Sequence, residues 1–103
     1  MDILSIHLSA FVQEEPQRID ILDDHTDVIV RLKSGETYAS SFFSYQNVAT
    51  LTAANRLSGD CLSGTFFWKN NMLLVEDIGK NTVERVVRFL IDEGDFTTIF
   101  KKL

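Results

Sequence analysis

The sequence is poor in the residues that crosslink or interrupt a chain, with one cysteine, one proline and five glycines among 103 residues. The single cysteine, Cys61, excludes an internal disulfide framework and indicates a reducing compartment. So little proline and glycine also excludes a disordered tail, because 45% of the residues are hydrophobic and can build a core. We therefore expect residues 1–103 to form a single domain.

Long apolar runs and a basic N-terminal segment are lacking as well. No stretch approaches the roughly 20 apolar residues of a membrane span. The first twelve residues carry Asp2 and no lysine or arginine, unlike a secretory signal. These absences predict a cytoplasmic protein that has no membrane partner.

Positive charge is scarce in the first third of the chain. Residues 1–30 carry seven acids and one base, Arg18, whereas residues 31–103 carry eight acids and nine bases. The net charge of −5 therefore comes from one acidic segment. The scattered bases argue against direct binding of nucleic acid, which needs clustered positive charge. An acidic surface favours a basic protein as the partner.

Apolar periodicity predicts an antiparallel meander in the first half of the chain. Alternating residues predict strands over residues 4–12, 18–22, 28–33 and 36–43. Turn-forming residues separate these strands at 14–17, at 23–26 and at Ser34-Gly35. Asp23, Asp24 and Asp27 gather at the second of these turns, and we expect Asp20 and Glu36 nearby in the meander.

The second half predicts two main helices. Ser44 is a candidate N-cap of a helix that continues to about Leu57 and ends at Gly59. A second helix, with a capping box at its start and helical spacing of apolar residues, runs from about residue 81 to 94. Between them we expect a loop at 60–64 and a hairpin of residues 65–68 with 72–76, and after them a short helix from residue 96. The predicted fold is α+β, an antiparallel sheet of about five or six strands with the two main helices packed on one face.

Catalytic and metal-binding patterns are weak. Cys61 lies in a glycine-flanked stretch, but nothing in the sequence places His7 or His25 beside it as an activating base. The acidic turn, residues 23–27, lacks the spacing and the central glycine of a calcium-binding loop. The carboxylate pairs at residues 76–77 and 92–93 are interpreted as exposed ends of elements. We therefore expect no enzyme, no metal and no cofactor.

From Leu32 onward the chain resembles a recurring type of small bacterial single-domain protein. The resemblance rests on residues 32–38, 42–45, 59–62, 67–68 and 90–96, which are hairpin and helix-end sequences. In size and acidity the chain is also similar to immunity proteins of contact-dependent growth inhibition and related polymorphic toxin systems. That resemblance implies a protein that binds and neutralises a cognate toxin, with no functional residue carried over.

The leading hypothesis is an immunity protein that blocks a cognate bacterial toxin, a nuclease, through an acidic surface. A nuclease must hold phosphates, so its active site is basic and complementary to such a surface. The expected partner-binding residues are acids of the meander and two aromatic anchors: Asp20, Asp23, Asp24, Asp27, Glu36, Tyr45 and Trp68. The alternative is a regulatory or ligand-binding module whose acidic turn binds a cation or a basic peptide. The aromatic residues also remain open to a second interpretation, as part of the core.

Overall fold

The structure is a computed structural model that describes residues 1–11 and 19–103. The predicted turn at 14–17 lies outside these residues, as do the end of the first predicted strand and the start of the second. The described strands are β1 (Ile3–Leu8), β2 (His25–Leu32), β3 (Thr37–Ser44), β4 (Met72–Val75) and β5 (Lys101–Lys102). The described helices are α1 (Tyr45–Ser58), α2 (Asp60–Gly64), α3 (Lys80–Glu93), α4 (Phe96–Ile99) and the 3₁₀ turn η1 (Ser9–Phe11).

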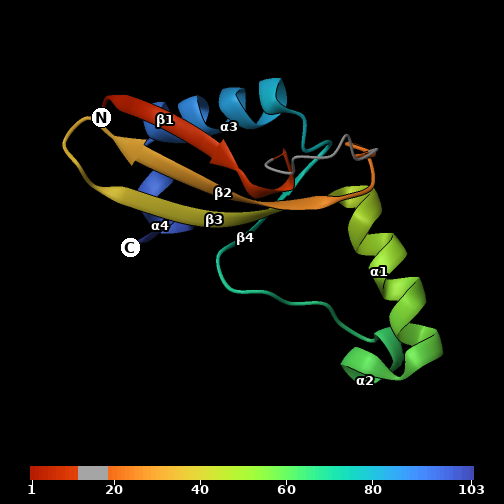
Figure 1. The fold of residues 1–103 in the computed structure, drawn as a ribbon. Helices are drawn as coiled ribbons and strands as arrows, with labels where there is room; N and C mark the ends of the chain where they lie inside the picture. Colours follow the sequence, from red (N-terminus) through yellow and green to blue (C-terminus); the bar gives the residue numbers. More distant parts are fainter. Residues whose placement is uncertain (12–18) are drawn as a thin grey trace.

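The strands form one sheet in the order β1-β2-β3-β4, with β5 beside β3 (Figure 1). The pairs β1/β2, β2/β3 and β3/β5 are antiparallel, whereas β4 runs parallel to β3. The expected hairpin at Ser34-Gly35 joins β2 to β3, where Gly35 adopts a φ of 94° that favours glycine. The α+β class is confirmed, with a sheet of five strands and two long helices among the described residues.

The core lies on one face of the sheet. The alternation predicted for β2 is confirmed, with Val28 and Val30 fully buried on that face. Helix α3 covers it with Val83 and Val87, and its amphipathic spacing is the reason it packs there. Helix α4 and the residue after it complete the core with two stacked aromatic rings, Phe96 and Phe100, whose centroids are 4.4 Å apart.

The first strand departs from simple alternation because it contains a bulge. Ile3 pairs with Leu32 while Ser5 pairs with Arg31, so Leu4 is an extra residue in β1. The bulge shifts the alternation by one position, which leaves Leu4 59% exposed and turns Ile3 toward the core. The strand then ends at Leu8 in η1.

Three local predictions are wrong within the described residues. Residues 19–22 form a turn rather than a strand. Residues 65–68 form no strand, and β4 pairs with β3 instead of with them. Residues 60–64 form the short helical turn α2 instead of a loop, and its three central residues adopt positive φ angles of 50–55°.

Helix α1 is capped as predicted, but it projects away from the sheet. Its first turn is capped by Ser44, whose Oγ accepts a hydrogen bond from the Asn47 amide at 3.0 Å, and Gly59 ends it at a φ of 89°. Only Asn47 of this helix is buried. We call α1, α2 and the return segment 65–71 the arm; α2 and the far part of α1 stand clear of the sheet in Figure 1, and the return segment contacts β3 again through Phe67 and Asn71. The radius of gyration, 14.7 Å, accordingly exceeds the about 13 Å typical of a chain this long.

Helices long and apolar enough to cross a bilayer are absent from the described part of the chain.

Candidate functional site

The candidate site is one end of the sheet, where β2 begins and both β3 and β4 end. The antiparallel pair His25↔Phe43 and the parallel pair Ser44↔Val75 place these three strand ends together. The turn before β2 and the segment after β4 are joined there by a hydrogen bond from the Ile78 amide to the Ile21 carbonyl, 2.9 Å long. These two segments and the start of β2 carry six acids that together define the acidic end: Asp20, Asp23, Asp24, Asp27, Glu76 and Asp77.

Two of these six acids were not expected there. Glu76 and Asp77 reach the acidic end because β4 runs parallel to β3, a pairing that the sequence did not indicate. The signal that could have found them is the carboxylate pair directly after an apolar strand. Segments 19–28 and 72–79 contain no lysine or arginine, so these carboxylates reinforce one another's negative potential.

Asp23 supports the start of the arm. Its carboxylate accepts hydrogen bonds from Asn47 Nδ2 at 3.1 Å and from Thr50 Oγ1 at 2.9 Å. A negative charge in the first turns of α1 is also favourable, because the helix dipole is positive at that end. Ser44 Oγ adds a third connection by donating to the Leu22 carbonyl at 2.8 Å. Asp23 therefore holds the turn against α1, and its two oxygens already have partners within the chain.

Asp77 plays the same part at the start of α3. One carboxylate oxygen accepts from the Gly79 amide at 2.8 Å and the other from Thr82 Oγ1 at 3.0 Å. The first bond satisfies the amide of the N-cap residue, which has no acceptor within the helix, and the second ties Asp77 to a side chain of the first turn. Asp77, like Asp23, is committed to the fold.

The other four acids present their carboxylates to solvent. Asp20 and Glu76 are exposed, and Asp24 is partly exposed beside His25, with 3.9 Å between its Oδ1 and the ring Nδ1. Asp27 lies on the sheet face opposite α3 and accepts from Ser41 Oγ at 3.0 Å. These four residues form the part of the acidic end that a partner can reach.

His25 is fixed in the middle of these acids. Its ring stacks on Phe43 with 4.8 Å between centroids, and Nδ1 lies 3.0 Å from Asn47 Oδ1. Because the amide nitrogen of Asn47 donates to Asp23, Oδ1 is the acceptor and Nδ1 of His25 carries the proton. The network positions the acidic turn rigidly on β3 and α1.

Glu36 does not belong to this site. It lies at the β2–β3 turn, and the ladder from His25↔Phe43 to Arg31↔Thr37 separates it from the acidic turn by about 20 Å. The expectation that Glu36 lies near Asp23, Asp24 and Asp27 is therefore wrong. A hydrogen bond from Lys102 Nζ, 3.0 Å away, and one from Tyr38 Oη lower the pKa of Glu36, and the same contact raises the pKa of Lys102. This pair fastens β5 to the sheet.

The two proposed aromatic anchors occupy different places. Tyr45, 61% exposed, begins α1 directly after Ser44, so it lies at the acidic end. Trp68, 69% exposed, lies in the return segment of the arm. Its neighbour Phe67 packs edge-on against Phe43, with 5.2 Å between centroids. Neither anchor is part of the core.

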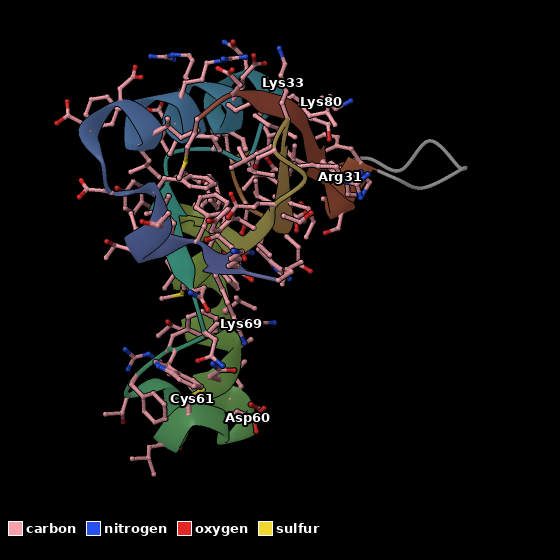
Figure 2. The ribbon with its side chains drawn as sticks, turned by 90° about the vertical axis from the view of Figure 1, so that its left-hand side faces the viewer. Arg31, Lys33, Asp60, Cys61, Lys69 and Lys80 are labelled. Atoms are coloured by element: carbon pink, nitrogen blue, oxygen red, sulfur yellow. The ribbon has the colours of Figure 1, made fainter. Side chains whose placement is uncertain are left out.

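Cys61 is far from both histidines. Figure 2 shows it with Asp60 at the far end of the arm. His25 contacts the first turn of α1, and the 14 residues of that helix separate the two by about 20 Å. His7 lies on β1 within the sheet. No cysteine–histidine pair is therefore assembled, and no three potential ligands from histidine, cysteine, aspartate and glutamate lie together for a metal within the described residues.

Comparison of the chain with protein-family models, with curated proteins and with solved structures finds no match.

Proposed function

We propose that this protein acts by binding another protein, as an immunity protein that neutralises a basic toxin, a nuclease, through its acidic end. The observation that carries the proposal is the gathering of six carboxylates, without lysine or arginine in the two segments that hold them, at one end of the sheet. Four of these carboxylates are accessible to a partner.

Charge of one sign on a rigid surface accelerates encounter with a surface of the opposite sign. A nuclease active site must attract phosphates, so it is a natural target for such a surface. The hydrogen bonds of Asp23, Ser44 and His25 fix the acidic turn before binding, which lowers the entropic cost of association. Tyr45 adds an exposed aromatic side chain beside the acids, of the kind that is enriched at interfaces.

The first test is genetic. A gene for a secreted toxin with a variable C-terminal domain is expected beside the gene for this protein, and co-expression is expected to protect cells from that domain. Absence of such a toxin gene, or failure to protect, contradicts the proposal.

The second test locates the surface with charge reversals that avoid Asp23 and Asp77. The variant that replaces Asp24, Asp27 and Glu76 with lysine is expected to lose protection. Its matched control reverses three exposed acids at the opposite end of the molecule and is expected to protect fully: Asp2, Glu93 and Asp95. Equal protection by both variants contradicts the assignment of the surface.

The cation-binding alternative has a separate readout. Calorimetry with calcium, magnesium and manganese is expected to show no binding heat, since the described residues assemble no set of three ligands. A saturable signal that is lost with Asp24→Asn would favour the alternative.

A further inference from the structure

The arm carries large apolar side chains that residues 1–11 and 19–103 leave exposed. Leu57 at the end of α1 is 92% exposed, Leu62 in α2 is 74% exposed, and Phe66 and Trp68 in the return segment are 52% and 69% exposed. Soluble proteins seldom expose so many large apolar residues together on one projecting element without a partner for them. Figure 2 shows that the end of the arm, marked by Asp60 and Cys61, stands well apart from the sheet.

The backbone of α2 is shaped to present this surface. Cys61, Leu62 and Ser63 adopt left-handed φ angles, which cost about 1–2 kcal/mol per residue relative to a right-handed turn. Hydrogen bonds from the Ser63 amide to the Gly59 carbonyl and from the Thr65 amide to the Cys61 carbonyl hold the turn. Leu62 consequently points into solvent.

The same chain carries an apolar groove between β4 and α3. It has a volume of about 760 Å³. Leu74 of β4 and Phe89 of α3 line it and are 38% and 61% exposed. Its charged residues are of both signs, Arg85, Arg88 and Asp92 of α3 and Glu76 after β4, and Tyr45 lies at the base of the arm.

The arm cannot fill its own groove. Tyr45 places the groove at the start of α1, whereas Leu57 and Leu62 lie at the other end of that 14-residue helix, about 20 Å away. Only another molecule can bring an arm tip to this groove. Because α1 begins at Tyr45, which lines the groove, the arm leaves the molecule beside the groove. Two copies that face each other on this side present arm to groove and groove to arm.

The exposed area is the right size for such an interface. The chain exposes 6812 Å², which is about 900 Å² more than the about 5,900 Å² expected for a folded monomer of 11.7 kDa. A standard interface buries about 800 Å² of each partner. One two-fold interface of this standard size would reduce the exposed area of each copy to about the value expected for a folded monomer of the same mass.

We propose that the chain forms a two-fold symmetric homodimer, in which the arm of each copy inserts its apolar tip into the β4–α3 groove of the other. The interface is isologous, so the same contact occurs twice. Arg85 of the partner's groove offers a positive charge to Asp60 at the arm tip, whereas Arg88 is already paired with Glu84. Glu76 of the acidic end and the neighbouring Tyr45 line the groove, whereas Asp20, Asp24 and Asp27 do not and stay on the outside of the dimer.

The test measures molar mass in solution by sedimentation equilibrium at about 1–100 μM, a range suited to interfaces of this size. The wild-type chain is expected at twice 11.7 kDa. Leu62→Asp in the arm and Phe89→Asp in the groove are each expected to raise the dissociation constant at least about 30-fold, as for the loss of a central interface side chain. Leu4→Asp, at an exposed leucine of β1, is the matched control and is expected to leave the dimer intact.

Mixing the two variants separates this arrangement from an arm-to-arm contact. A Leu62→Asp chain keeps a normal groove and a Phe89→Asp chain keeps a normal arm, so together they form one of the two contacts. The mixture is expected to associate more tightly than either variant alone. A monomeric wild-type chain at 100 μM, a dimer insensitive to Phe89→Asp, or a mixture no tighter than its components would overturn the proposal. Toxin protection is read out separately, so neither proposal depends on the other.

Discussion

Asp23 belongs to the acidic end and also supports the start of α1, and the supporting role leads to a specific expectation. Replacing Asp23 with alanine removes two hydrogen bonds, those from Asn47 Nδ2 and Thr50 Oγ1. Each such bond contributes about 0.5–1.5 kcal/mol, and the lower half of that range applies because the site is partly solvated. Loss of the negative charge at the start of α1 costs a further 0.3–1 kcal/mol or so. The buried Asn47 amide also loses its acceptor.

Together these effects amount to about 2 kcal/mol of unfolding free energy, which lowers the melting temperature by roughly 10 °C for a domain of this size. The assay is urea unfolding, read as a change in midpoint at constant slope. Asp27→Ala is the control, since it removes one exposed hydrogen bond from Ser41 and is expected to cost less than about 0.5 kcal/mol. If Asp23→Ala is no less stable than Asp27→Ala, the supporting role of Asp23 is refuted.

Three further expectations concern the arm, the end of the sheet and the core. Gly64→Ala would place a methyl group 2.8 Å from the Thr52 carbonyl at a φ of 75°, so we expect α2 to loosen from α1 and the Thr65 amide to exchange hydrogen faster. The pKa of Glu36 is lowered by its lysine partner, so its contribution to stability is present above its ordinary value of 4.5 and is lost as the pH falls through the lowered pKa. The unfolding midpoints of wild type and Glu36→Gln should therefore converge in acid. Phe96→Ala, at a side chain 1% exposed, should cost about 3–5 kcal/mol in urea unfolding.

Much of the fold followed from local patterns. The β2–β3 hairpin was predictable because apolar alternation and the Ser34-Gly35 turn agree in register. The ends of α1 were predictable because Ser44 and Gly59 supply the cap and the left-handed residue that a helix needs. The outward direction of α1 was not predictable from local patterns. Helices α3 and α4 cover the core face of the sheet, and which helices pack on that face is decided by tertiary packing.

The candidate site was partly predictable for a similar reason. Asp20, Asp23, Asp24 and Asp27 lie close in the sequence, so their proximity followed from one turn. Glu76 was missed because the parallel pairing of β4 with β3, which brings it in, is a long-range property that turn chemistry does not encode. Glu36 was misplaced although the β2–β3 hairpin itself was predictable, because the length of that ladder puts Glu36 at the other end of the two strands.

The most direct test of the central claim is the rate of association between the purified protein and its toxin at several salt concentrations. Electrostatic steering by the acidic end predicts an association rate constant that falls at least about 10-fold as the ionic strength rises from about 0.01 M to 1 M. It also predicts slow, salt-insensitive association for the variant with lysine at positions 24, 27 and 76. A rate constant that does not change with salt, or one that this variant leaves unaltered, would contradict the proposal that the acidic end binds the partner.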